Sequence, residues 1–497
     1  MARMHSLISQ KNKFMKKNVI FLLLGLAFIL RIYKINSPII GMHSWRQADT
    51  AAISRNYYEN GYKFFYPQID WRGDSPGYIE TEFPIYSFIV ALMYEIFGVS
   101  EVFGRLLSVV FSLITMYFLY LLVLKLVDKN TALWSCFFFA IFPPNIFYSR
   151  TFQPESALIM SLVLGVYFFS QWLDTDKKRC FFLSSIFIAL ACLLKLPSLY
   201  IGLPLLYLAW LKFWKKILIQ WSLWLYGFLV LLPVALWYYH AHKIFLNYGL
   251  TFGIWEYGSD KWGNWNLVFT LKFWNRILFQ NLAEDYFVWI GFVIFIIGLS
   301  IKRKTKQEKL FDIWIISLVI YFVIVARGNY VHLYYQLPFM IPATVFLGKV
   351  FMRNFSPHIF KNKKSLVLSI CLIGILVLGA GRYSIYMKKE NTKHSEEFKL
   401  AEIVKQKTKE ESLIIAVDSN DPTLLYLSHK KGWHAFSGQL NDSFLSQKKQ
   451  KGAEYIIGNH SSFKGESEQK ILGSLFRNYH VVFDDEKSFI LKLIKDL

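Results

Sequence analysis

Apolar stretches of about twenty residues alternate with short polar segments over the first 390 residues of the chain. A helix rises about 1.5 Å per residue, so a stretch of about twenty apolar residues is long enough to cross the hydrocarbon core of a bilayer. The pattern predicts a polytopic α-helical membrane protein with about eleven transmembrane helices. The predicted spans are Val19–Ile35, Arg105–Val127, Thr131–Tyr148, Ser156–Leu173, Cys180–Leu194, Leu199–Phe213, Ile217–Tyr239, Phe287–Ile301, Leu310–Ala326, Tyr330–Phe351 and Leu366–Tyr383.

A long polar loop, residues 38–84, follows the first predicted span and ends at a shorter apolar stretch, Pro84–Phe97. A stretch of this length is more typical of an interfacial or re-entrant segment than of a spanning helix. The sequence therefore predicts that the end of the loop is held at the membrane surface.

The composition becomes that of a soluble protein from about residue 391 onward. The chain is therefore expected to divide into a membrane domain, residues 1–390, and a small α/β domain, residues 391–497. No internal repeat occurs in either part. The elements predicted for the second domain are a helix over Ser395–Lys409 and strands over Leu413–Val417, Tyr455–Ile457, His480–Phe483 and Phe489–Leu493.

The net charge is +22, and the basic residues gather in short clusters between apolar stretches. One orientation places every cluster on the cytoplasmic side, as the positive-inside rule requires. The N-terminus is then cytoplasmic, and residues 41–84, residues 240–286 and the C-terminal domain face outward. The clusters are Arg3, Lys11, Lys13, Lys16 and Lys17; Lys177, Lys178 and Arg179; Lys212, Lys215 and Lys216; Lys302, Arg303, Lys304 and Lys306; and Arg353, Lys361, Lys363 and Lys364.

Because the basic residues are clustered between apolar stretches and not spread over a soluble face, nucleic acid is not expected as a partner.

The first apolar stretch resembles a signal peptide but lacks a small-residue cleavage site, so we interpret it as an uncleaved span. Hydrophobic residues make up 54% of the chain and charged residues 18%, where a soluble domain carries about a quarter. The four cysteines lie in or beside apolar stretches, so neither a disulfide framework nor a zinc site is indicated.

The loop after the first span is rich in acids, cations and tryptophan. His43, Arg46 and Asp49 are spaced three residues apart, so a helix that begins near Ser44 places them on roughly one face. The other candidate residues of this loop that bind substrate or act in catalysis are Trp45, Gln47, Asp70, Arg72, Glu80 and Glu82.

Three further outward turns contribute candidate substrate-binding residues, namely Arg150, Glu155, Lys195, His332, Tyr334, Tyr335 and Gln336. Most of these also have a purely structural interpretation. Arg150 and Lys195 are compatible with helix ends that snorkel to the interface. The tyrosines are compatible with an aromatic belt, and Glu155 with a favourable charge at a helix N-terminus.

The order of several short motifs resembles integral-membrane GT-C glycosyltransferases of family 39, the dolichyl-phosphate-mannose-protein mannosyltransferase and aminoarabinose transferase type. The motifs are Phe83-Pro84-Ile85-Tyr86-Ser87, Phe97-Gly98 followed by Gly104-Arg105-Leu106-Leu107-Ser108, and His332-x-Tyr334-Tyr335-Gln336-Leu337-Pro338. The resemblance implies transfer of a sugar, with inversion, from a polyprenyl-phosphate carrier to a lipid, glycan or protein acceptor at the outer face.

The chain departs from the usual signature of that family at three places. Alignment on Ile53-Ser54-Arg55 puts Arg46-Gln47 where the family's acidic pair is expected and Asp49 where it has an arginine. The common Lys-Pro-Pro is replaced by Glu82-Phe83-Pro84. The catalytic acid therefore cannot be carried over to a single position from the resemblance.

Displacement at an anomeric carbon needs a carboxylate that accepts the proton of the acceptor hydroxyl, and cations that stabilise the departing phosphate. We rank Asp49 first as the base and Glu82 second. Arg46, Arg72, Lys195 and His332 are the candidate phosphate partners. No metal or other cofactor is expected, and the source is expected to be a bacterial inner membrane. A transporter or lipid flippase is the main alternative function, and a non-catalytic membrane scaffold is another.

Overall fold

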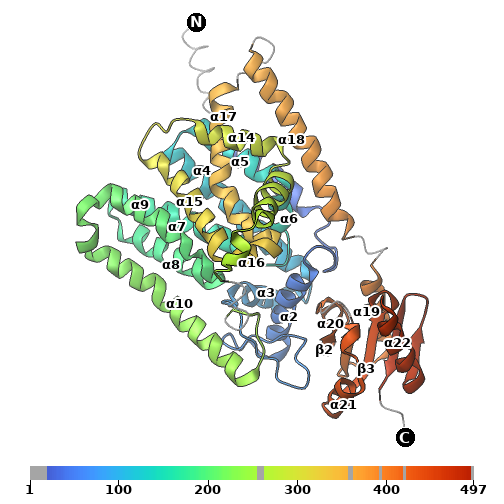
Figure 1. Cartoon of the computed structure of the whole chain (residues 1–497). Coiled ribbons are helices and arrows are strands. Elements are labelled where there is room, and N and C mark those ends of the chain that lie inside the picture. The colour runs from blue at the N-terminus through green and yellow to red at the C-terminus, as the bar shows by residue number, and fades with distance from the viewer. Residues whose placement is uncertain (1–18, 255–261, 356–361, 391–394, 418–420, 494–497) are drawn as a thin grey trace. The chain divides into compact units, whose positions relative to one another are not determined.

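The computed structural model describes residues 19–254, 262–355, 362–390, 395–417 and 421–493 (Figure 1). Contacts divide the chain into two compact units. The first, here called the helical unit, comprises Met1–Ile35, Leu106–Tyr238 and Trp255–Ile385. The second, here called the loop–sheet unit, comprises Asn36–Arg105, Tyr239–Ile254 and Tyr386–Leu497. The long outer loop thus groups with the C-terminal residues, and the expected division at residue 390 stays a prediction.

Helices make up the helical unit. The first, Val19–Ile32, is short and apolar. Helices α7 and α8 are joined by a turn of two residues and pack side by side. The other elements that lie wholly or mainly in this unit also form helices or helical turns. They are α4 (Glu101–Leu126), α5 (Lys129–Ile141), α6 (Pro143–Tyr148), α7 (Glu155–Thr175), α8 (Lys178–Leu194), η1 (Leu196–Ile201), α9 (Gly202–Phe213), η2 (Trp214–Ile219), α10 (Trp221–Tyr248), α12 (Trp265–Val268), α13 (Leu271–Trp274), η3 (Asn275–Tyr286), α14 (Ile290–Ser300), η4 (Gln307–Lys309), α15 (Leu310–Ile324), α16 (Ala326–Val331), η5 (Leu333–Phe339), α17 (Met340–Asn354) and α18 (Lys363–Lys388).

Among the described residues, 5 helices are long and apolar enough to cross a membrane, or 6 if one bent pair counts as a span. They are α4, α7, Leu196–Ile219, α10 and α18, and the bent pair is Leu271–Tyr286 with Ile290–Ser300. The class of helical membrane protein is confirmed, whereas the count of about eleven spans stays a prediction.

Several predicted spans are not single helices. The stretch Thr131–Tyr148 is broken at Phe142, which has extended backbone angles and precedes Pro143. Residues before proline avoid the helical region, so the break follows from local sequence. The stretch Tyr330–Phe351 is likewise divided among α16, η5 and α17. Windows of average hydropathy do not detect such breaks, because the residues on either side remain apolar.

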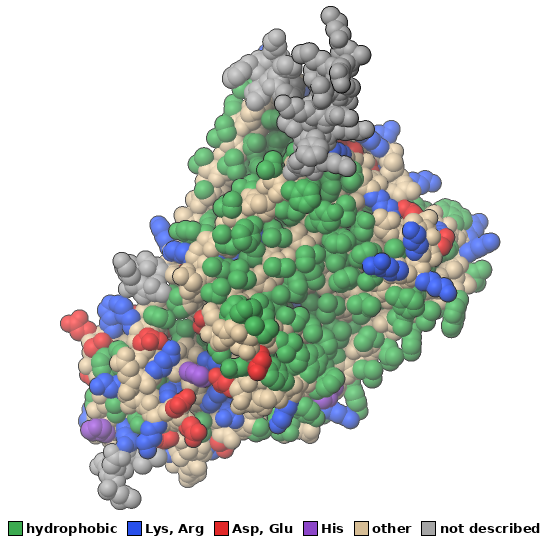
Figure 2. All heavy atoms as spheres, turned by 180° about the vertical axis from the view of Figure 1, so that it is seen from behind, with side chains coloured by type: hydrophobic (Ala, Val, Ile, Leu, Met, Phe, Trp, Pro, Cys, Tyr) green, Lys and Arg blue, Asp and Glu red, His purple; other side chains and the backbone are tan. Residues whose placement is uncertain are grey.

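The helices expose much apolar surface, and Figure 2 shows hydrophobic side chains gathered over a broad face of them. Trp221, Phe228 and Leu236 of α10 are exposed, as are Ile370 and Val377 of α18. A soluble surface rarely carries a contiguous apolar patch of this kind, and membrane lipid would cover it.

The loop–sheet unit begins with two helices, α2 (Ser44–Asn60) and α3 (Ile85–Phe97). The predicted helix with its start near Ser44 is confirmed. Between the two helices, the loop packs on a small core that includes Ile53, Tyr57 and Ile69. Helix α3 contains 13 residues and is apolar, as predicted for Pro84–Phe97, and its place at a membrane surface stays a prediction.

The C-terminal part of this unit is a five-stranded sheet with strand order β2-β1-β3-β5-β4. Strands β2, β1 and β3 are parallel, and β5 pairs antiparallel with β3 and β4. Ile415, Ile456 and Leu491 lie in its core. The elements are α19 (Glu396–Lys407), β1 (Leu413–Val417), α20 (Thr423–Leu427), β2 (Lys431–Ala435), η8 (Ser437–Gln439), α21 (Asp442–Gln450), β3 (Ala453–Asn459), η9 (His460–Ser462), α22 (Glu466–Asn478), β4 (His480–Asp484) and β5 (Ser488–Lys492).

The helix over residues 395–409 and the four predicted strands are confirmed within a few residues. Strand β2, Lys431–Ala435, was not predicted, because Lys-Gly-Trp-His-Ala has neither an apolar run nor strict alternation. This strand lies at the edge of the sheet and pairs with β1 alone among the strands.

Gly432 in β2 leaves no room for a side chain. Its φ is +148°, and a Cβ atom there would lie 1.9 Å from the carbonyl oxygen of Ile414. We expect Gly432→Ala to lower the free energy of unfolding by about 1–3 kcal/mol, because the backbone must shift out of register. Thermal unfolding of the detergent-solubilised protein measures the change. Gly438→Ala is the matched control, since its Cβ would meet nothing within 4 Å, and an equal loss in both variants would contradict the expectation.

Candidate active site

Helix α2 places two of the candidate residues, Arg46 and Asp49, in the interior of the loop–sheet unit. The helix starts after His43, which takes a left-handed conformation with a φ of 53°. Arg46 and Asp49 are both buried. The indole Nε1 of Trp71 donates a hydrogen bond of 2.9 Å to Oδ1 of Asp49. Asp49 is therefore an internal carboxylate held by a neutral donor.

Burial raises the pKa of Asp49 to about 8. The hydrogen bond from Trp71 and the charge of Arg46 act in the opposite direction, whereas the charges of Asp421 and Asp70 raise the pKa further. A carboxyl group with a pKa near the working pH can take up and release a proton during a reaction. This is the property that a general base requires.

Glu82, the second candidate base, is differently placed. It forms an ion pair with Arg46 and accepts a hydrogen bond of 3.1 Å from the hydroxyl of Thr81. The guanidinium of Arg46 also lies 5.5 Å from the centroid of the Phe252 ring. Because a full positive charge already neutralises Glu82, the geometry favours Asp49 as the base.

Glu80 connects the outer loop to the chain that follows α10. It is fully buried and accepts a hydrogen bond from the hydroxyl of Thr251, and its Oε1 lies 3.5 Å from Nδ1 of His242. Its backbone pairs on both sides, with Glu80 N donating to Leu250 O and Phe252 N to Glu80 O. These contacts give Glu80 a structural role and bring Phe252 to Arg46.

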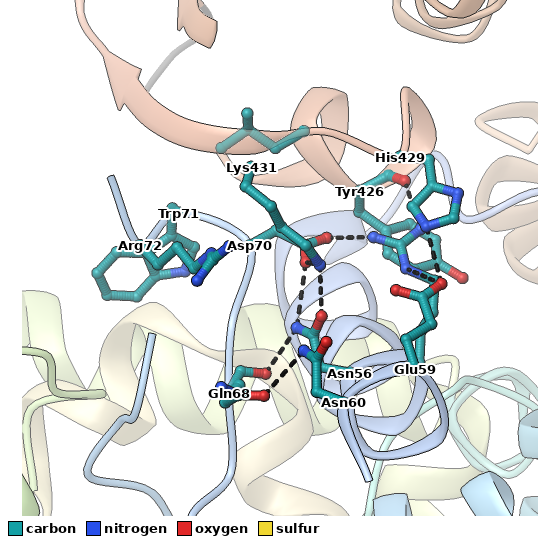
Figure 3. Close-up of polar contacts among 12 residues, drawn as sticks. Asn56, Glu59, Asn60, Gln68, Asp70, Trp71, Arg72, Tyr426, His429 and Lys431 are labelled. Carbon is teal, nitrogen blue, oxygen red and sulfur yellow. Dashed lines mark hydrogen bonds and ion pairs between the residues drawn. The ribbon is translucent and has the colours of Figure 1, made fainter. Parts of the chain in front are cut away.

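Asp70 lies in a buried cluster of charged residues. It accepts hydrogen bonds from Arg55 at 2.5 Å and from Lys431 at 2.6 Å, and a third from Asn56 at 3.2 Å (Figure 3). Burial alone would raise the pKa of Asp70, but the charges of Arg55 and Lys431 hold it below its ordinary value. Protein groups engage both of its oxygens, so Asp70 links parts of the fold, and its contact with substrate stays a prediction.

The remaining candidates of the loop make local contacts. Burial and the nearby charge of Lys389 lower the pKa of His43 to about 4, so this histidine is neutral at physiological pH. The amide of Gln47 donates to the carbonyl of Met42 at 3.4 Å, and Arg72 donates to the carbonyl of Ser75 at 2.9 Å. Trp45 is half-buried near the start of α2.

A second group of candidate residues gathers in the helical unit. Nζ of Lys195 lies 3.7 Å from the ring centroid of Tyr335, 4.9 Å from that of Tyr334 and 3.7 Å from Oε1 of Glu155. The second oxygen of Glu155, Oε2, is buried, and no hydrogen-bond donor among the described residues reaches it. These side chains line a small cavity together with Leu158, Ile159, Pro197, Ser198, Tyr200, Tyr321, Leu337 and Pro338.

The other candidate residues of the helical unit make contacts within the protein. Arg150 is buried and donates to the carbonyl of Lys34 at 2.7 Å. The ring of His332 stacks on Tyr334 at 5.4 Å between centroids. Gln336 is fully buried, donates to Asn329 and accepts from Asn281. Gln336 is therefore part of the scaffold that carries the two tyrosines.

The candidate residues thus form two groups, one in each compact unit. Phe252, His434, Tyr200 and Tyr321 were not predicted, because single aromatic or histidine residues in an aromatic-rich chain carry no distinguishing pattern. Among the described residues, no group of three or more His, Cys, Asp or Glu side chains is placed to hold a metal ion. Metal-independent chemistry stays a prediction.

Comparison with known proteins agrees with the resemblance. Residues 76–240 match the family model of dolichyl-phosphate-mannose-protein mannosyltransferases. An uncharacterised protein of Aquifex aeolicus (strain VF5) is 36% identical over 133 residues, which is 26% of this chain and 30% of that protein. The match therefore spans less than a third of the length of this relative.

Two solved structures share the fold over nearly the whole chain. ArnT from Cupriavidus metallidurans, solved with undecaprenyl phosphate bound, has a TM-score of 0.65 at 14% identity, and the match covers 96% of this chain and 98% of ArnT. The archaeal oligosaccharyltransferase AglB from Archaeoglobus fulgidus, solved with an inhibitory peptide and a dolichol-phosphate, has a TM-score of 0.61 at 12% identity over 90% of this chain and 70% of AglB. At these identities the likeness shows the fold. The family model matches residues 76–240, and over nearly the whole chain the two structures show that the fold is shared.

Proposed function

We propose that this protein is an inverting glycosyltransferase that moves a monosaccharide from a polyprenyl-phosphate carrier to a lipid, glycan or protein acceptor at the outer face of a bacterial inner membrane. The buried carboxyl of Asp49, with its pKa raised to about 8, is the observation that carries the proposal. The general kind of reaction is supported by the family match and by the polyprenyl phosphates that the two similar structures hold.

In the proposed reaction, Asp49 takes the proton of the acceptor hydroxyl while that oxygen attacks the anomeric carbon. The bond between this carbon and the phosphate oxygen breaks, and its electron pair leaves with the carrier phosphate. A single displacement inverts the configuration at carbon, and the base needs only to be ionised and within reach of the hydroxyl. No step requires a metal or an oxidant.

Within the helical unit, we propose Lys195 as the partner of the carrier phosphate. Lys195 faces the rings of Tyr334 and Tyr335, and its ion-pair contact with Glu155 is a longer one, at 3.7 Å. A lysine in such a site can bind a phosphate as a point charge.

Transfer of a radiolabelled sugar from a polyprenyl-phosphate donor tests the proposed function. Membranes that contain the protein, supplied with a panel of such donors, are expected to form a labelled acceptor, whereas membranes without it are not. Labelled donor that crosses the bilayer unchanged would favour a flippase, and absence of both results would favour a scaffold.

Loss of the charge at Lys195 is expected to weaken donor binding. Lys195→Met should raise KM for the polyprenyl-phosphate sugar by about 10- to 100-fold, because a charge-assisted hydrogen bond contributes about 1.5–3 kcal/mol. Lys195→Arg should recover part of the loss. Steady-state kinetics with purified protein measures both, and Lys178→Met at the other end of α8 is the matched control. An unchanged KM in Lys195→Met would remove this residue from the phosphate site.

The rate is expected to depend on pH through Asp49. Only the ionised carboxylate accepts a proton, so kcat/KM should rise with pH up to about 8 and then level off. Arg46, Asp421 and Asp70 are the charged groups that act on Asp49. Asp421→Asn should move the inflection to lower pH, because a negative neighbour is removed. A profile that falls between pH 6 and 8 would contradict the assignment of Asp49 as a base.

A further inference from the structure

We propose that Trp71 is a positioning residue for Asp49 and that the C-terminal sheet fixes Trp71 in place through its edge strand β2. This inference rests on the proposed function for its catalytic meaning. The contacts that carry it all lie within the loop–sheet unit. They join the helix that bears Asp49 and the outer loop that follows it to strand β2, which lies hundreds of positions later in the sequence.

The backbone of the loop is hydrogen-bonded to β2 on both sides of Trp71. Gly432 N donates to the carbonyl of Asp70 at 3.1 Å, and Gly73 N donates to the carbonyl of Gly432 at 2.7 Å. Loop residues 70–73 are therefore bound to the edge strand β2 through both backbone groups of Gly432. Trp71 and Arg72 lie between the two bonded positions, so their backbone is fixed by the strand.

Glycines allow close packing at two places, between the loop and β2 and between β2 and β1. Gly73 has a φ of +58°, and a Cβ atom on it would lie 2.5 Å from Nε1 of Trp433. Gly432 tolerates no Cβ either, because of the carbonyl of Ile414. The contact between loop and strand thus depends on the absence of a side chain at Gly73, and the pairing of β2 with β1 depends on its absence at Gly432.

Side chains strengthen the same contact. Lys431 of β2 reaches the carboxylate of Asp70, the residue directly before Trp71 (Figure 3). Arg55 of α2 binds the other oxygen of that carboxylate and also donates to the carbonyl of Tyr426 at 3.1 Å. Asp70 therefore links α2, the loop and the C-terminal sheet at one buried point.

The indole of Trp71 lies against a histidine of the same strand. The ring of His434 meets it edge-on, with 5.1 Å between centroids and 65° between planes. Phe252 lies 6.4 Å from the indole, centroid to centroid. These contacts orient Trp71 so that its N–H points at Oδ1 of Asp49. The bond to Oδ1 leaves Oδ2 to accept the proton of the acceptor hydroxyl.

The ring of His434 packs on the indole of Trp71 and carries no charge near Asp49. Burial lowers the pKa of His434 to about 4, so the ring is neutral wherever Asp49 titrates. Removing the imidazole therefore changes no charge near Asp49. A change in the protonation of Asp49 in a His434 variant is therefore not caused by the loss of a charge on His434, which makes the variant informative.

Infrared difference spectra of the full-length protein in nanodiscs test the inference without any substrate. The protonated-carboxyl band of Asp49 is identified by its loss in Asp49→Asn, and in the wild type it should titrate near pH 8. Trp71→Phe should move the midpoint up by about one pH unit, because a hydrogen bond to the charged carboxylate is lost. His434→Leu should move it in the same direction by less. His480→Leu, an exposed histidine of the same sheet, should leave it unchanged.

The result that overturns the inference is a midpoint that stays at its wild-type value in both Trp71→Phe and His434→Leu. The proposed function fails separately, if Asp49→Asn transfers sugar at the wild-type rate. An equal shift in His480→Leu would show a general loosening of the sheet and would also overturn the inference.

Discussion

Replacing Asp49 by asparagine should lower the rate of sugar transfer by about 10²- to 10⁴-fold, the usual contribution of a general base. Asparagine has nearly the same size and still accepts the hydrogen bond from Trp71 through its carbonyl oxygen, so the fold should be kept. It cannot take a proton from the acceptor hydroxyl. Single-turnover transfer from a polyprenyl-phosphate sugar measures the loss, and KM for the donor should change little.

Two further variants make this prediction specific. Asp74→Asn changes an exposed carboxylate of the same loop, which pairs with Lys451 at 3.8 Å, and it should leave the rate near that of the wild type. Glu82→Gln breaks the ion pair with Arg46 and should reduce the rate less than Asp49→Asn does. A larger loss in Glu82→Gln would transfer the role of base to Glu82.

Replacing Asp70 by alanine should lower the free energy of unfolding by about 3–5 kcal/mol, because it leaves buried cations without their partner. Arg55 and Lys431 both bind this carboxylate, and its side chain is 1% exposed. The folded-state pKa of Asp70 lies below its ordinary value. The stabilisation should therefore persist at neutral pH and fall away only as the pH drops through that lowered pKa.

Thermal unfolding of the solubilised protein at several pH values measures this loss. Asp74→Ala is the control, since an exposed ion pair contributes about 0–1 kcal/mol. Adding Lys431→Met to Asp70→Ala should recover part of the stability, because one unpaired charge is removed. Equal melting temperatures for Asp70→Ala and Asp74→Ala would contradict the account of the cluster.

The sequence predicted the helical class, the small α/β domain and the helix that carries Arg46 and Asp49. The first two predictions succeeded because they rest on apolar period and length, which burial imposes along the chain, and the third because residues three apart share a helix face. The broken spans at Phe142 and in residues 330–351 escaped prediction, because hydropathy averages over them. Strand β2 was not predicted, because its pairing with neighbouring residues in space, and not its own composition, makes it a strand.

The site could be predicted in part. Asp49 and Glu82 were ranked from charge and position. Only the structure shows the ion pair between Arg46 and Glu82 and the hydrogen bond from Trp71 to Asp49. Asp70 was expected to bind substrate, which stays a prediction, and the structure shows that Arg55 and Lys431 bind its carboxylate. Pairings such as that of Asp70 with Lys431 join residues hundreds of positions apart, and no local pattern encodes them.

The most direct test of the central claim tracks one sugar from donor to product with purified protein in nanodiscs. An isotopically labelled polyprenyl-phosphate sugar and its acceptor are supplied, and the anomeric configuration of the product is read by NMR. The account predicts one released polyprenyl phosphate for each sugar transferred, inverted configuration, and loss of both products in Asp49→Asn. Retained configuration, or carrier that stays intact while the lipid moves between leaflets, would contradict it.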